Sequence, residues 1–106
     1  MSWPVDADGD FLRRLQAQGF NFSEPHIIDF NVEFRQWPPT HEALRLLRTR
    51  YQNLEVVEPD AESPGYVSFQ VLGQVSYEHI TSVQRSTSSL VATFGGACES
   101  WGVLSS

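Results

Sequence analysis

Hydrophobic and polar residues alternate near the start of the chain, over residues 26–34. A period of two over this length predicts a strand with one buried face and one exposed face. The predicted buried positions are Ile28, Phe30, Val32 and Phe34, and the predicted exposed positions are Asp29, Asn31 and Glu33.

Three more strands are predicted further along the chain. Residues 66–72 alternate in the same way, with Val67, Phe69 and Val71 on one side and Gly73 marking the end. Residues 54–58 form a short apolar run before an acidic turn, and residues 97–104 form the last predicted strand.

Three segments have the apolar spacing of helices. The first, over residues 8–18, follows aspartates that are suited to capping and ends at Gly19. Thr40 caps the second helix, and Ser76 caps the third and longest, which Gly95-Gly96 stops. The apolar faces of the second and third helices consist of Ala43, Leu44, Leu47 and Tyr51, and of Ile80, Val83, Leu90, Val91 and Phe94.

Without the first helix, the predicted order is β-α-β-β-α-β, which is typical of an α+β ferredoxin-like sandwich. This fold has a four-stranded antiparallel sheet, with both helices on one face and the first and third strands in its centre. We predict a single domain over residues 1–106, with an N-terminal helix and turn at 1–25 and an α+β core at 26–104. The N-terminal helix is a candidate to fold across the sheet face that the other helices leave open.

Composition narrows the class of protein. The chain has 106 residues, of which 41% are hydrophobic, enough for a compact core. It lacks an apolar run of the roughly 20 residues that span a bilayer, and its start does not resemble a signal peptide. A single cysteine, Cys98, excludes an internal disulfide. These features favour a cytoplasmic protein that does not contact membranes.

The charge argues against nucleic-acid binding and for a basic protein partner. The chain has thirteen acidic residues and seven arginines, and the formal net charge is −6. Phosphate binding normally relies on clustered basic residues. The RNA-recognition module has the same element order, but it stacks bases on exposed aromatic residues, whereas Phe30, Phe34 and Phe69 belong to the predicted core face.

Two motifs resemble a known family. The first predicted strand opens with Pro25 and His26 and continues with Asp29-Phe30, and the last contains Glu99-Ser-Trp-Gly102. In this order and spacing they resemble the RraB-like family, relatives of the regulator of ribonuclease E activity B. The resemblance runs from about residue 11 to residue 104.

This resemblance implies an α+β sandwich and a regulatory, non-enzymatic protein. The founding member binds ribonuclease E in its noncatalytic part and inhibits RNA processing. It is longer and carries an acidic tail, whereas this chain ends at Ser106. The partner expected here is therefore ribonuclease E or another protein with a basic segment.

We predict that exposed acids and one tryptophan bind this partner. Asp29, Asn31 and Glu33 project from the open sheet face in the predicted register. The alternative is that these residues only keep the sheet soluble or, less favoured, hold a divalent metal. Trp101 is either an exposed interface anchor or a residue packed beneath the N-terminal helix, and Gly102 marks a bulge or a close backbone approach. The predicted partner-binding residues are Asp29, Asn31, Glu33, Glu99 and Trp101.

The sequence predicts no catalytic residue, cofactor or metal site. The three histidines and Cys98 lack the spacing of zinc ligands. We expect His26 to contact a backbone carbonyl and Cys98 to be a small buried residue. Two rival hypotheses remain open. One is a small-molecule sensor that pairs edge to edge as a dimer, and the other is an enzyme using His26 with Asp29 or Glu33. The expected oligomeric state is a monomer or a weak dimer.

Overall fold

The computed structural model describes residues 3–103 and contains three α-helices, one short 3-10 helix and four strands. Their order in the chain is α1 (Ala7–Ala17), β1 (Pro25–Phe34), α2 (His41–Arg50), β2 (Glu55–Val57), β3 (Tyr66–Gln74), α3 (Tyr77–Val91), η1 (Ala92–Phe94) and β4 (Gly96–Val103).

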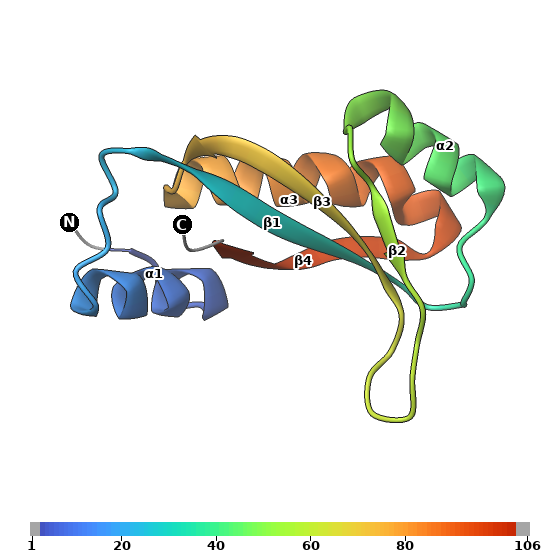
Figure 1. Cartoon of the computed structure of the whole chain (residues 1–106), viewed down its shortest axis with the longest axis horizontal. Helices are drawn as coiled ribbons and strands as arrows, with labels where there is room; N and C mark the ends of the chain where they lie inside the picture. Colours follow the sequence, from blue (N-terminus) through green and yellow to red (C-terminus); the bar gives the residue numbers. More distant parts are fainter. Residues whose placement is uncertain (1–2, 104–106) are drawn as a thin grey trace.

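The strands form one antiparallel sheet in the order β2-β3-β1-β4. The first and third strands are therefore central, as the sequence predicted, and the α+β ferredoxin-like fold is confirmed. Helices α2 and α3 cover one face of the sheet, and within residues 3–103 no helix covers the other face (Figure 1). We call this uncovered side of the sheet the open face.

The predicted register of β1 is confirmed. The side chains of Ile28, Phe30 and Val32 have no exposed surface, and they face α2 and α3 together with Phe69 of β3. Asp29, Asn31 and Glu33 lie on the opposite side. Alternation alone therefore places the core between the sheet and the helices.

The largest differences from the predicted strand lengths are in β3 and β2. Strand β3 continues through Gly73 to Gln74, because Gly73 still pairs with His26 of β1. A side chain at Gly73 would collide with the imidazole of His79, 2.6 Å from the position of an added Cβ, so this glycine permits close packing and does not end the strand. Strand β2 is only three residues long.

The helix caps are those that the sequence predicts. Thr40 and Ser76 accept hydrogen bonds from the backbone N–H groups of residues 43 and 79, at 3.1 Å in both cases. The end of the third helix differs: α3 stops at Val91, and one 3-10 turn leads to Gly95. The φ angle of Gly95 is +75°, a left-handed conformation that glycine adopts without strain. Of the predicted last strand, Leu104 lies outside the described residues.

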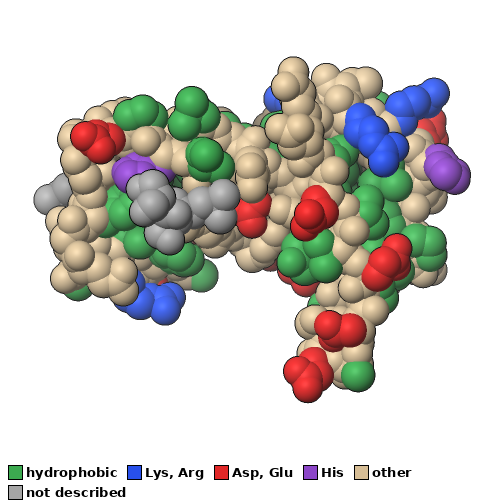
Figure 2. Space-filling model, in the orientation of Figure 1, with side chains coloured by type: hydrophobic (Ala, Val, Ile, Leu, Met, Phe, Trp, Pro, Cys, Tyr) green, Lys and Arg blue, Asp and Glu red, His purple; other side chains and the backbone are tan. Residues whose placement is uncertain are grey.

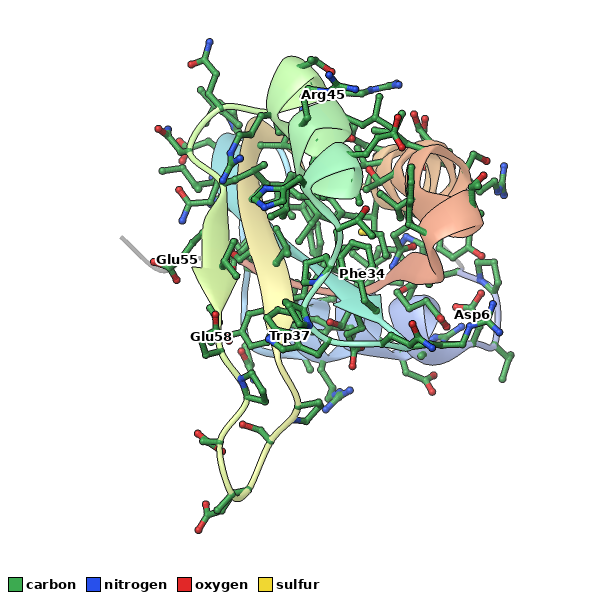
Figure 3. The ribbon with its side chains drawn as sticks, turned by 90° about the vertical axis from the view of Figure 1, so that its right-hand side faces the viewer. Asp6, Phe34, Trp37, Arg45, Glu55 and Glu58 are labelled. Carbon is green, nitrogen blue, oxygen red and sulfur yellow. The ribbon has the colours of Figure 1, made fainter. Side chains whose placement is uncertain are left out.

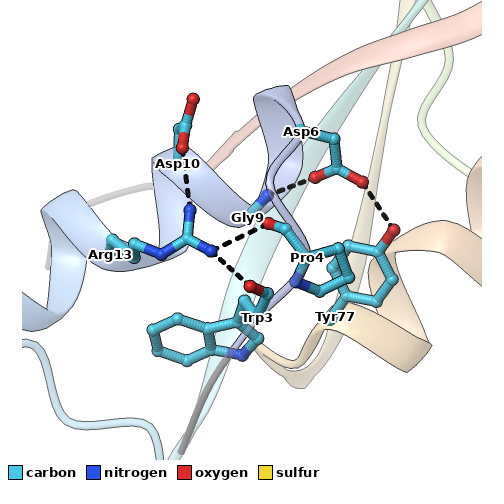
Figure 4. A network of polar contacts seen from close by, with 7 residues as sticks. All are labelled: Trp3, Pro4, Asp6, Gly9, Asp10, Arg13 and Tyr77. Atoms are coloured by element: carbon cyan, nitrogen blue, oxygen red, sulfur yellow. Dashed lines mark hydrogen bonds and ion pairs between the residues drawn. The ribbon is translucent and has the colours of Figure 1, made fainter.

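Helix α1 does not fold across the open face, and that expectation was wrong. It packs on the helix-covered side, where Leu12 is fully buried and Phe11 stacks on Trp101 with ring centroids 4.5 Å apart. Hydrogen bonds fix its start, since Asp6 accepts from the backbone N–H of Gly9 at 2.7 Å and from the Tyr77 hydroxyl at 2.7 Å (Figure 4). Apolar Phe11 and Leu12 bury more surface beside Trp101 than they would on a polar sheet face.

Contacts from α3 block the outer edge of β4. The Ser88 hydroxyl accepts from the Cys98 backbone N–H at 2.9 Å and donates to the Cys98 carbonyl at 3.4 Å. Gln84 donates to the Glu99 carbonyl at 3.1 Å. The register with β1 also shifts between residues 31 and 32, so Glu99 is the extra residue of a β-bulge, and Gly102 does not mark it. Bulges and bonded edge groups hinder pairing with another chain.

Candidate partner-binding face

The open face is polar and acidic over the central strands. Glu55 of β2 also lies on this face, because it pairs with Ser68, which in turn pairs with Asn31. Figure 3 shows the Glu55 side chain directed away from the helices. The apolar side chains of the face lie at both ends, with Ile27 and Leu72 where β1 begins and Val57 and Tyr66 at the opposite end. The central part consists of Asp29, Asn31 and Glu33 of β1, Glu55 of β2, Ser68 and Gln70 of β3, and Ser100 of β4.

Hydrogen bonds between strands hold two of the predicted residues in place. Asp29 accepts a hydrogen bond from the Ser68 hydroxyl at 2.8 Å. The Asn31 amide donates to the Ser100 hydroxyl at 3.3 Å, while its Oδ1 is buried without a hydrogen-bond partner among residues 3–103. Asp29 and Asn31 are half-buried between their neighbours, so they form the floor of the face.

Glu33 and Glu99 lie at the edge of this floor and are exposed. Both line a shallow hollow of about 430 Å³, together with Arg35 and the backbone near Gly96. The bulge in β4 brings Glu99 to this position. The structure therefore brings four predicted residues to one side of the sheet or its edge, namely Asp29, Asn31, Glu33 and Glu99.

The acids of this face form no ion pair with any other residue that the structure describes. Among residues 3–103, the ion pairs join Arg13 to Asp10 at 2.8 Å and Arg45 to Glu42 at 3.7 Å, both within single helices. In Figure 2, acidic side chains extend over the sheet and the loop after β2, whereas basic side chains gather over α2 and α1. Charge of one sign therefore dominates the open face, which favours cationic partners.

Trp101 lies away from the open face. It pairs with Phe30 on the core side of the sheet, and 7% of its surface is exposed. Its indole N–H donates to Asp8 of α1 at 2.8 Å. This is the alternative that the sequence left open, a tryptophan packed beneath the N-terminal helix, and a buried ring offers no exposed anchor to a partner.

The histidines and the cysteine have structural contacts. The Nε2 atom of His26 lies 2.9 Å from the carbonyl of Asn21, and its ring faces the core side, opposite to Asp29. No acid lies within hydrogen-bond distance of His26 in the described part of the chain. Burial raises the pKa of the Cys98 thiol to about 12, which disfavours the reactive thiolate.

Residues 3–103 contain neither a metal-binding cluster nor a membrane-spanning helix. No group of three or more His, Cys, Asp or Glu residues is arranged to hold a metal ion there. Nor does that part of the chain contain a helix with the length and apolar character needed to cross a bilayer.

Sequence reasoning missed several residues of functional interest. Glu55 was not assigned to the face because a three-residue strand gives little alternation. Gln84 and Ser88 appeared to be ordinary polar positions on α3, since their roles depend on contact with a distant strand. Ile27 and Leu72 face solvent on the open face, and their alternation with Ile28 and Val71 was the available signal.

Comparison with known proteins agrees with this description. The model of the family described as regulator of ribonuclease activity B, RraB, matches residues 5–103. No protein among those with curated functions matches the chain. The family match covers nearly the whole chain, including β1 and the Glu99–Gly102 segment, so the protein belongs to the RraB family of ribonuclease-activity regulators.

Proposed function

We propose that this protein regulates a ribonuclease by binding it through the open face, without catalysing a reaction itself. The observation that carries the proposal is a continuous row of polar and acidic side chains on two central strands that no described helix covers. A rigid sheet holds these side chains at fixed spacing, which favours specific recognition.

The expected partner is ribonuclease E, through a segment rich in arginine or lysine. Glu33, Glu55 and Glu99 are exposed and have no ion pairs within residues 3–103, so a cationic segment meets carboxylates that are free to pair. Electrostatic complementarity of this kind governs the association rate and the choice of partner more than the affinity of the final complex. Asp29 and Asn31 supply fixed hydrogen-bonding groups beneath the exposed glutamates.

The test is binding to purified ribonuclease E after charge reversal at two exposed positions, Glu33→Lys with Glu99→Lys. We expect the association rate to fall at least about tenfold, because repulsion replaces attraction over a distance of about one Debye length. Surface plasmon resonance measures both rate constants. A second variant, Asp29→Asn, removes one charge but retains an oxygen that accepts from Ser68, and we expect a smaller decrease.

The matched control is Glu24→Lys with Glu62→Lys, which changes the net charge equally at exposed positions away from the centre of the face. It should bind with nearly the association rate of the unmodified protein. Equal binding by the Glu33/Glu99 variant would show that the open face is not the interface. If the unmodified protein fails to bind, ribonuclease E is not its partner.

A further inference from the structure

The two edges of the sheet differ in their protection. At the β4 edge, a bulge and side chains of α3 occupy the backbone groups. At the other edge, β2 pairs with only residues 66–68 of β3. In the described structure, no strand pairs with residues 70–74 on the side away from β1.

This free segment lacks the features that normally prevent strand pairing. Residues 66–76 contain no charged residue and no proline, although lysine, proline and bulges are the usual protection of an exposed edge. Leu72 is 71% exposed, and Ile27 beside it on β1 is 44% exposed. In a chain with a net charge of −6, an uncharged edge beside two exposed apolar side chains is a place where like-charged copies can approach.

The segment is also complementary to itself. Its sequence is Gln70-Val-Leu-Gly-Gln74, with glutamine at both ends and Leu72 in the middle. When two copies pair antiparallel about Leu72, the glutamines of one copy face those of the other, and the two leucines meet. Val71 then faces Gly73, which has no side chain to oppose it, and the His79 imidazole of the same copy lies beside that glycine.

We propose that two copies of this protein form a symmetric dimer by antiparallel pairing of β3 edges, with the two-fold axis at Leu72. Such pairing satisfies backbone groups on both edges, and the same surface patch serves in both copies. The free segment of β3 is limited on one side by β2 and on the other by Gln74, after which the chain enters α3. A five-residue edge is a small interface, so the dimer is a weak one.

The first test is the mass of the unmodified protein in sedimentation equilibrium, from about ten micromolar to one millimolar. We expect the average mass to rise from monomer toward dimer over this range. Leu72→Lys should raise the dissociation constant at least about tenfold, because two like charges then face each other across the axis. Val5→Lys is the matched control, since Val5 is 93% exposed and lies outside the sheet.

The second test measures the register. Directly opposed residues of antiparallel strands have Cα atoms about 4.5–5.5 Å apart, which is within the span of a disulfide. Leu72→Cys should therefore cross-link rapidly with diamide, which accepts the two thiol hydrogens, whereas Val5→Cys should cross-link only slowly through collisions. The native Cys98 is 1% exposed and does not compete.

A constant monomer mass up to one millimolar would overturn the dimer. A dimer that persists in Leu72→Lys, or one in which Leu72→Cys reacts no faster than Val5→Cys, would overturn the proposed edge and axis. Because Leu72 is largely exposed, we expect both variants to fold, and circular dichroism checks this. None of these readouts depends on ribonuclease binding, so failure of the dimer leaves the proposed function intact.

Discussion

At the scale of single residues, the contact between Asp8 and Trp101 joins segments that are far apart in the sequence. The indole N–H donates to the Asp8 carboxylate at 2.8 Å, and Phe11 covers the ring. A buried donor that loses its acceptor costs more free energy than the average hydrogen bond contributes. This contact therefore holds α1 against the body of the sheet.

We predict that Asp8→Ala lowers the free energy of unfolding by about 1–3 kcal/mol, since it leaves the Trp101 indole without an acceptor. Urea denaturation measures the change. Asp10→Ala is the control: Asp10 forms an exposed ion pair with Arg13, and such pairs contribute about 0–1 kcal/mol. In the background of Trp101→Phe, the effect of Asp8→Ala should largely disappear, and a full effect there would contradict this role.

The burial of a residue could be predicted from the sequence where it depended on residues nearby in the chain, and not where it depended on distant segments. The burial of Ile28, Phe30 and Val32 followed from alternation alone. The position of Trp101 did not, because a bulge at Glu99 places both Cys98 and Trp101 on the core side, and a bulge has no reliable sequence signal. The contacts of Ser88 and Gln84 depend on how α3 lies over β4.

At the scale of elements, the N-terminus of α1 is the junction with α3. Figure 4 shows Asp6 between the Gly9 backbone and the Tyr77 hydroxyl. Arg13 completes the junction, since its guanidinium donates to the carbonyl oxygens of Trp3 and Pro4 and pairs with Asp10. The sequence predicted the helix and its acidic cap. It did not predict the hydrogen bond from Tyr77 to Asp6, because these residues come together only in the folded chain.

The Asp6 cap predicts a specific dependence of stability on pH. Its hydrogen bond from the Gly9 backbone, and then that from Tyr77, lower the pKa of the Asp6 carboxyl below 3.8. A carboxyl whose pKa is lower in the folded state stabilises the fold above its unfolded pKa, and this contribution decreases as pH falls through the folded pKa. The destabilisation caused by Asp6→Ala should therefore be full at pH 7 and shrink below about pH 4.

Thermal or urea unfolding between pH 7 and pH 2.5 measures this difference. The control is Ser76→Ala, which removes the corresponding cap of α3. A serine hydroxyl does not titrate in this range, so the effect of that substitution should change less with pH. A pH-independent effect of Asp6→Ala would contradict the charged cap.

At the scale of the whole molecule, charge is segregated between the surfaces of the fold. Five of the seven arginines lie on α2 and α1, while the open face and the loop after β2 carry acids (Figure 2). Topology and the sign of the net charge were both readable from the sequence, because the strand and helix order and the residue counts determine them. The free edge of β3 was not predicted, since it depends on where the three residues of β2 pair.

This segregation predicts that salt slows the binding of the partner. Raising ionic strength from about 0.05 M to 0.5 M shortens the Debye length from above 10 Å to below 8 Å. The association rate with ribonuclease E should fall several-fold, and the dissociation rate should change little. Stopped-flow measurements separate the two rates, and an association rate that is insensitive to salt would contradict electrostatic attraction.

The buried thiol between β4 and α3 has a practical consequence. Cys98 is 1% exposed, and its backbone is bonded to Ser88, so a labelling reagent reaches it only when this strand and helix separate. Because the chain contains one cysteine, the labelling rate measures how often β4 and α3 separate locally. Timing it with and without a bound ribonuclease would reveal whether the regulator stiffens when it engages its target.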